Sequence, residues 1–403
     1  MTSSADPAAQ EAAFLLSAAA VRSRCRIVLE AAERGAAPHF RLDPSRLDEA
    51  AERVAGLTRR RFPDLSVPLH SRWRHFSVGG HDRAGLVAPA ADGPERARAQ
   101  IDLAIVSVLL DAGAGGRWSY REAATGETFS RSEGLAVASL RAMQGGLFSA
   151  DPENPWRADA AALLAVTPGS LGRALQHEAD NPLDGLEGRA RLLRRLGEVA
   201  AASPHHFGRP ARLGRLYDHW LPHREALTAP AVLETLLHAL GPIWPGGESL
   251  AGLSLGDCGR HSCVPGSGLV PFHKLSQWLA YSLVEPLAEA GFRVTGLDGL
   301  TGLAEYRNGG LFLDCGVLEA RDPGLARRIL EAASEPVVEW RALTVALLDR
   351  LAGRVRERLG TAAALSLGQV LEGGSWLAGR EIALERRAGG RPPLMVASDG
   401  TVF

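Results

Sequence analysis

The segment Pro271-Phe-His-Lys-Leu-Ser-Gln-Trp-Leu-Ala-Tyr-Ser-Leu283 has the periodicity of an amphipathic helix. Pro271 suits the first position of that helix, where its missing N–H leaves no hydrogen bond unmade. Apolar residues repeat at helical spacing and predict one buried face; they are Phe272, Leu275, Leu279 and Leu283. Lys274, Gln277 and Tyr281 repeat in the same way on another face, so we expect these side chains to converge on one small-molecule ligand.

Lys274 is the only lysine of the chain, since 44 of the 45 Lys and Arg residues are arginines. Lys274 and His273 lie in the first turn of the expected helix, where the helix dipole disfavours a cation by about 0.3–1 kcal/mol. A bound anion would remove this conflict. Phosphate suits helix N–H groups beside a lysine and the glycine-bearing segment Val264-Pro-Gly-Ser-Gly268. The alternative is an ordinary solvated first turn.

Two acidic residues flank this helix in the sequence. Asp257 lies in the turn-rich segment Leu255-Gly-Asp-Cys-Gly-Arg-His261, and Glu305 lies in Leu303-Ala-Glu-Tyr-Arg-Asn308. Each can be a plain turn or surface acid, which is the default for Asp and Glu. Beside a phosphate site, the two suggest the carboxylate pair of a hydrolase that acts at a sugar carbon. His261, at the end of the first segment, is a further candidate for substrate binding.

The composition is that of a soluble globular protein, with 46% hydrophobic and 23% charged residues. The net charge of −1 argues against a nucleic-acid binder, for which a basic surplus is expected. Four scattered cysteines form no disulfide framework, and Cys258, His261 and Cys263 lack a second ligand cluster at zinc spacing, so no metal is expected. No apolar run reaches about 18 residues and no signal peptide is recognisable, which predicts a cytoplasmic protein without a membrane partner. The oligomeric state is left open.

Apolar periodicity predicts helices along most of the chain, the strongest at residues 11–34, 95–111, 186–202 and 335–359. Polar and bulky residues alternate around Thr125-Gly126 and predict a small hairpin near residues 117–131. We therefore expect a mainly α, multi-helical globular fold with one β-hairpin element. The loop Asp151-Pro-Glu-Asn-Pro155 is the expected seam within a single domain at 11–403, between helical subdomains at about 11–150 and 156–403. The second of these subdomains carries the candidate site.

Four motifs resemble the uracil-catabolism protein family of the URC pathway, and the resemblance runs over nearly the whole chain. They are Leu255-Gly-Asp257, Phe272-His-Lys-Leu-Ser-Gln-Trp-Leu-Ala-Tyr-Ser-Leu283, Leu300-Thr-Gly-Leu-Ala-Glu-Tyr-Arg-Asn-Gly-Gly310 and Ser398-Asp-Gly-Thr-Val-Phe403. The pathway of that family degrades uracil through a nucleotide and a ribosylurea-type intermediate and releases urea.

A fainter resemblance is to the queuosine-nucleotide N-glycosylase family, which has a helical fold similar to DNA glycosylases. The pattern of that family is an Asp, then Phe-Tyr-Lys-Arg-Ala-Gln, then Asp-Tyr-Arg. It is similar in order and spacing to Asp257, Phe272-His-Lys-Leu-Ser-Gln277 and Glu305-Tyr-Arg307. The departures are His273 for Tyr, Glu305 for Asp and the continuation Asn308-Gly-Gly310, and they affect the base-recognition side of the pocket.

Together the resemblances imply an N-glycoside hydrolase of pyrimidine catabolism that needs no cofactor. Its substrate would be a phosphorylated ribosylurea-type intermediate, cleaved to urea and ribose phosphate. Asp257 would be the catalytic carboxylate near the sugar carbon and Glu305 would hold the leaving group. Tyr306 would pack beside that group, and Arg307 would steady a carboxylate.

Three alternatives stay open from the sequence. Asp257 can merely cap a turn. The protein can be a non-catalytic binding or scaffolding protein for the nucleotide intermediate of the same pathway. A metal-dependent amidohydrolase is a third reading, which the missing His-x-His pattern and ligand clusters disfavour.

Overall fold

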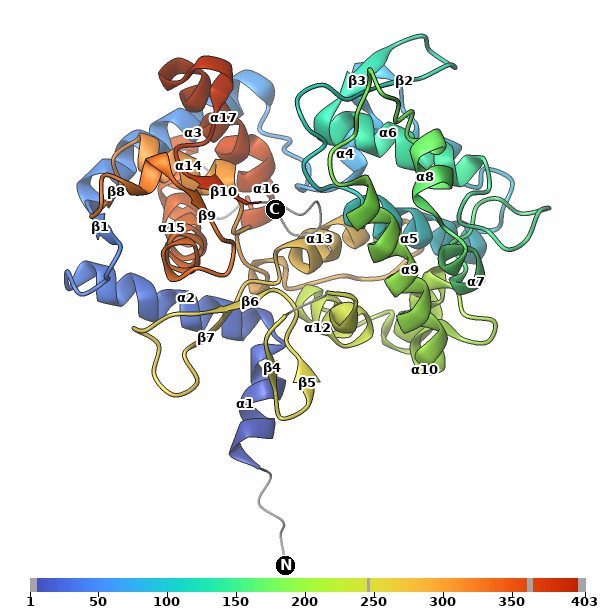
Figure 1. Ribbon diagram of the computed structural model, residues 1–403, viewed down its shortest axis with the longest axis horizontal. Helices are drawn as coiled ribbons and strands as arrows, with labels where there is room; N and C mark the ends of the chain where they lie inside the picture. Colours follow the sequence, from blue (N-terminus) through green and yellow to red (C-terminus); the bar gives the residue numbers. More distant parts are fainter. Residues whose placement is uncertain (1–5, 245–246, 361–364, 398–403) are drawn as a thin grey trace, which may run out of the picture. The chain divides into compact units, whose positions relative to one another are not determined.

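Helices make up most of the secondary structure, so the predicted mainly α fold is confirmed (Figure 1). The computed structural model describes residues 6–244, 247–360 and 365–397. The strands of this part of the chain form only two-stranded sheets. None of the described helices is both long and apolar enough to cross a bilayer.

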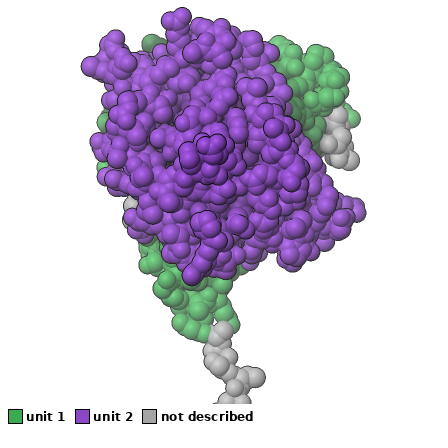
Figure 2. Space-filling model, turned by 90° about the vertical axis from the view of Figure 1, so that its right-hand side faces the viewer, with its two compact units in different colours: residues 1–70, 246–277, 296–397 green, residues 71–245, 278–295, 398–403 purple. Residues whose placement is uncertain are grey.

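The chain forms two compact units from interleaved segments (Figure 2). Of the described residues, the first unit takes 6–70, 247–277 and 296–397 apart from 361–364, and the second takes 71–244 and 278–295. The expected seam Asp151-Pro-Glu-Asn-Pro155 lies inside the second unit. The single domain at 11–403 with two subdomains stays a prediction.

The first unit is built around one long helix, which contacts α2, α3 and α14 (Figure 1). That helix is α15 (Glu335–Leu359), with the bounds that periodicity predicts, and its apolar positions such as Val338 and Leu347 are buried. The other helices of this unit are α1 (Pro7–Leu15), α2 (Ala18–Glu33), α3 (Leu47–Arg61), α14 (Tyr306–Asp314), α16 (Leu367–Val370) and α17 (Trp376–Arg386). The helix expected at 11–34 is thus two helices, because Ser17 caps a new start at Ala18 with its side chain.

Short strand pairs join these helices. The antiparallel pairs are β1 (Phe40–Leu42) with β8 (Leu318–Ala320), β4 (Ser249–Leu250) with β5 (Leu253–Ser254), and β6 (Cys258–Arg260) with β7 (Leu269–Pro271). β9 (Ile329–Leu330) and β10 (Met395–Val396) pair in parallel. β6 packs on α15 so closely that a Cβ at Gly259 would lie 2.5 Å from the side chain of Val338.

The central helix α13 (Lys274–Glu289) begins three residues later than predicted. Pro271 is the last residue of β7, paired with Cys258, and is not the first residue of a helix. The N–H groups of Phe272 and His273 both donate to the carbonyl of Asp257, at 2.9 and 3.2 Å. His273 has a φ of +48°, and this left-handed residue turns the chain from the strand into the helix. Pairing with β6 therefore outcompetes the local helix-start signal, since a strand end tolerates a proline.

The second unit contains α5 (Gly93–Leu109), the helix expected at 95–111, with Ile101, Ile105 and Val108 buried. The other helices that lie wholly in this unit are α4 (Trp73–Phe76), α6 (Arg131–Gln144), α7 (Ala160–Leu164), α8 (Pro168–Ala174), α9 (Leu186–Ala202), α10 (Pro204–Phe207), α11 (Leu216–Trp220) and α12 (Ala229–Leu240). The predicted hairpin is present as β2 (Ser119–Arg121) and β3 (Thr128–Ser130), paired antiparallel. Residues 278–289 of α13 also belong to this unit.

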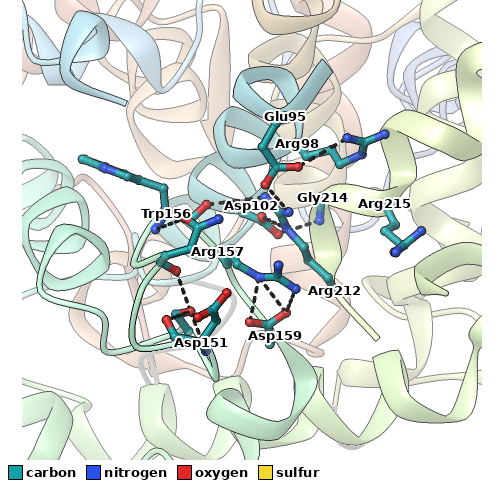
Figure 3. A network of polar contacts seen from close by, with 12 residues as sticks. Glu95, Arg98, Asp102, Asp151, Trp156, Arg157, Asp159, Arg212, Gly214 and Arg215 are labelled. Carbon is teal, nitrogen blue, oxygen red and sulfur yellow. Dashed lines mark hydrogen bonds and ion pairs between the residues drawn. The ribbon is translucent and has the colours of Figure 1, made fainter. Parts of the chain in front are cut away.

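A buried ion-pair network holds α5 to the segment around residue 212 (Figure 3). The carboxylate of Asp102 accepts hydrogen bonds from Arg212 Nε and from the N–H of Gly214, both at 2.6 Å. Arg212 Nη1 also donates to Glu95 at 2.5 Å. A Cβ at Gly214 would lie 2.3 Å from the carbonyl oxygen of Arg98, so only glycine fits beside this carboxylate.

Candidate functional site

Asp257 is the centre of the candidate site, and its carboxylate is held from two sides. Arg341, on α15, donates from Nη1 to Oδ1 and from Nη2 to Oδ2, each at 2.8 Å. The N–H of Lys274, at the start of α13, donates to Oδ2 at 3.0 Å. Asp257 therefore caps α13 as well as forming a bidentate ion pair.

These contacts keep Asp257 ionised. Burial raises the pKa of Asp257, but the charge and hydrogen bonds of Arg341, with the Lys274 N–H, outweigh it and lower the pKa to about 2. Its side chain is 10% exposed. Asp257 is thus a fixed negative charge at any physiological pH.

The anion at the start of α13 is the carboxylate of Asp257. The dipole conflict at Lys274 and His273, which predicted a bound phosphate, is relieved in part by the Asp257 carboxylate. His273 is buried and donates from Nε2 to the carbonyl of Leu15 at 2.8 Å, and burial lowers the pKa of its imidazole. Phosphate binding by Lys274 and His273 stays a prediction.

The two other residues predicted on the face of Lys274 are both buried. Gln277 donates from Nε2 to Thr301 Oγ1 at 2.7 Å, and its side-chain oxygen accepts from the Thr301 N–H at 3.3 Å. Tyr281 is 0% exposed and belongs to the second unit, whereas Lys274 and Gln277 belong to the first. Their convergence on one ligand stays a prediction.

Glu305 caps the neighbouring helix α14. Its side chain accepts hydrogen bonds from the N–H groups of Arg307 at 2.8 Å and Asn308 at 2.5 Å. Burial raises the pKa of Glu305, and it outweighs those two hydrogen bonds and the positive charge of Lys274, which lower it. The Asn308 side chain accepts from Ser375 Oγ at 2.9 Å, so the residue just before α17 steadies the start of α14.

Arg341 contacts Asp257 and the backbone next to Glu305. Besides its bidentate contact with Asp257, it donates from Nε to the carbonyl of Ala304 at 3.3 Å, one residue before Glu305. Its guanidinium carbon lies 4.0 Å from the ring centroid of Phe272. The sequence analysis missed Arg341, although a charged residue between the buried Trp340 and Ala342 of an apolar helix is a signal that could have found it.

His261 has a structural environment. Its Nδ1 accepts from the N–H of Cys263 at 3.1 Å, so Nε2 carries the proton and donates to Glu339 at 2.9 Å. Glu339 also accepts from the N–H of Phe40 at 2.8 Å. Both ring nitrogens are engaged and 2% of the residue is exposed, and substrate binding by His261 stays a prediction.

Tyr306 and Arg307 lie side by side in the first turn of α14. The Arg307 guanidinium carbon lies 4.8 Å from the Tyr306 ring centroid. Tyr306 is 37% exposed, whereas Arg307 is 8% exposed. Within the described ranges, no group of three or more His, Cys, Asp and Glu residues is arranged to hold a metal ion.

Comparison with known proteins gives relatives along the whole chain. Protein urg3 of Schizosaccharomyces pombe is 41% identical over 405 residues, which cover 97% of this chain and 98% of that protein. Uracil catabolism protein 4 of Lachancea kluyveri is 35% identical over 433 residues, with 97% and 98% covered. The family model DUF1688, described as a protein of unknown function, matches residues 14–403. With relatives matched over nearly their full lengths and a family model that spans almost every residue, the chain belongs to the DUF1688 family.

Proposed function

We propose that this protein acts in uracil catabolism as an N-glycoside hydrolase that cleaves a phosphorylated ribosylurea-type intermediate to urea and ribose phosphate. The place in uracil catabolism is supported by the name of the relative from Lachancea kluyveri, a uracil catabolism protein. The reaction is supported by one observation: Arg341 contacts both Asp257 and the Ala304 carbonyl next to Glu305, and the pKa values of the two acids are shifted in opposite directions. Two carboxyl groups with separated pKa values are suited to separate acid and charge-stabilising roles.

Cleavage of an N-glycosidic bond builds positive charge on the sugar carbon. Asp257, ionised and fixed in orientation by Arg341, would stabilise that charge, although the guanidinium neutralises part of its field. Glu305, whose pKa is raised by burial, would act as the acid and give a proton to the leaving urea nitrogen as the bond breaks. Water would then attack the sugar carbon and return a proton to Glu305.

Paired substitutions test these roles. Asp257→Asn keeps the size but loses the charge, and it should lower turnover at least about 100-fold. Glu305→Gln should lower turnover about 10²- to 10⁴-fold and remove one limb of the pH–rate profile. Free urea and ribose phosphate are the measured products, and circular dichroism checks folding. Asp92→Asn is the control, because Asp92 caps α5 through the Glu95 N–H in the second unit and has no proposed role in the chemistry.

A binding or scaffolding protein is the second candidate, and one observation favours it. Both oxygens of Asp257 already accept hydrogen bonds from the protein, as a purely structural carboxylate would. Tight binding of the intermediate without product release, by wild type and both variants, would support this candidate and contradict the hydrolase. Release of urea that is abolished by a chelator and restored by metal would support an amidohydrolase instead.

A further inference from the structure

Arg307 differs from the other buried arginines of the described chain. Most of these pair with a carboxylate: Arg72 with Asp111, Arg83 with Glu122, Arg212 with Asp102, and Arg341 with Asp257. Arg189 instead donates to four backbone carbonyls. Arg307 has no ion pair within the described residues and one carbonyl partner, Gly390, at 2.8 Å from Nη1. A charge buried to this degree ordinarily has a carboxylate or several acceptors.

The unused part of Arg307 is one edge of its guanidinium. Nε is buried and has no hydrogen-bond acceptor among the residues described. Nη2 makes no hydrogen bond with a described residue, and the one contact of the guanidinium is that of Nη1 with Gly390. Nε and Nη2 are the two parallel donors with which arginine binds a carboxylate or phosphate bidentately. A buried donor without an acceptor costs free energy, and a ligand that supplies the acceptor recovers it.

The surroundings of this edge suit a substrate. Tyr306, whose ring lies 4.8 Å from the guanidinium carbon, is more than a third exposed, so Arg307 lies directly behind a solvent-accessible side chain. The nearest acid, Glu305, directs its oxygens to the N–H groups of Arg307 and Asn308 and does not pair with the Arg307 guanidinium. The first turn of α14 thus contains the proposed proton donor, Glu305, and the Nε–Nη2 edge of the Arg307 guanidinium.

We propose that the Nε–Nη2 edge of Arg307 binds an oxyanion of the substrate bidentately, and that this oxyanion is the phosphate monoester of the ribosyl intermediate. The assignment rests on the proposed function for the identity of the substrate. It places the phosphate on α14, beside Glu305, whereas the sequence places it at Lys274. At the start of α13 the Asp257 carboxylate already supplies a negative charge that opposes a second anion.

Calorimetric titration with ribose 5-phosphate, inorganic phosphate, ribose and acetate tests this assignment without requiring turnover. Arg307→Lys keeps the charge and loses the fork, and it should weaken ribose 5-phosphate binding about 10-fold, with a larger loss, up to about 100-fold, in Arg307→Gln. Ribose binding should not change. Arg354→Lys is the matched control. Arg354, on α15, forms an exposed ion pair with Asp48 of α3, and the variant should bind ribose 5-phosphate as wild type does. Thermal melting shows whether each variant is folded.

The outcomes separate this assignment from the proposed reaction. Unchanged ribose 5-phosphate affinity in a folded Arg307→Lys protein overturns it, and so does a loss confined to Lys274→Ala. If acetate binds with the same affinity as inorganic phosphate, the oxyanion is a carboxylate and the assignment to the phosphate monoester is wrong. If ribose 5-phosphate binding depends on Arg307 but no glycosidic bond is cleaved, the oxyanion site stands and the hydrolase fails. If cleavage occurs and Arg307→Lys leaves kcat/KM unchanged, the hydrolase stands and the oxyanion site fails.

Discussion

Two buried Asp–Arg pairs, one in each unit, differ in the direction in which the pKa of the carboxyl group is shifted. Asp257 accepts hydrogen bonds from both Nη groups of Arg341 and from the N–H of Lys274, and its pKa is lowered to about 2. Asp102 accepts hydrogen bonds from one nitrogen of Arg212 and from the N–H of Gly214, and burial raises its pKa to about 7 despite these contacts. Arg212 is shared with Glu95, whereas Arg341 contacts both oxygens of Asp257. The comparison teaches that a guanidinium bound to a buried carboxylate through two nitrogens keeps it ionised, whereas one that contacts it through a single nitrogen and also binds a second carboxylate does not.

The largest expected effect comes from removing each arginine. Arg341→Met leaves the ionised Asp257 nearly buried and unpaired, which should cost about 3–5 kcal/mol of unfolding free energy at pH 7. Arg212→Met should cost less, about 1–3 kcal/mol, because Asp102 can take up a proton near neutral pH. Urea denaturation measures both. Arg328→Met removes an exposed pair with Asp322 and should fall within about 1 kcal/mol of wild type. Equal costs for Arg341→Met and Arg212→Met would break the comparison.

The pH dependence of stability should run in opposite directions for the two carboxylates. The folded protein holds a proton on Asp102 between the unfolded pKa of 3.8 and about 7, so this group makes the protein less stable as pH rises through that window. Relative to Asp102→Asn, wild type should lose up to about 4 kcal/mol between pH 4 and 7. Asp257 stabilises the fold above pH 3.8 and loses that contribution as pH falls toward 2. Denaturation curves at several pH values measure the differences, and a flat Asp102 profile would contradict this account.

The smallest expected effect concerns the sharing of Arg212. Glu95 is 31% exposed, so Glu95→Gln should cost at most about 1 kcal/mol. It should also lower the pKa of Asp102, because Arg212 then serves a single carboxylate. Carboxyl NMR titration follows the second effect. An unchanged or higher Asp102 pKa would show that sharing does not explain the difference between the two pairs.

Long periodic helices could be predicted from the sequence because their signals are local. α9 and α15 have the expected bounds, and the hairpin of β2 and β3 lies where turn chemistry predicts it. The start of α13 could not be predicted, because it depends on pairing between Cys258 and Pro271, thirteen positions apart. The segment at 398–403, part of the family resemblance, lies outside the described residues.

The candidate site could be predicted only in part. Asp257 and Glu305 are indeed positioned by neighbouring helix starts, but each is a cap, which a motif does not reveal. Arg341 is 84 residues from Asp257 in sequence and was invisible to spacing arguments. The open edge of Arg307 depends on which neighbours fail to contact it, and a sequence carries no signal of an absent partner.

The contacts between α15 and the segment around β6 restrict where residues can be inserted in this part of the chain. Arg341 holds Asp257, just before the strand, and Glu339 holds His261, just after it, while Gly259 touches the helix between them. Two side chains that are two positions apart on the helix thus fix both ends of the three-residue strand β6. An inserted residue between Asp257 and His261 would release one of these anchors. Residues 262–268 turn back into β7 outside these two contacts, so we expect an insertion there to disturb Asp257 less than one between Asp257 and His261.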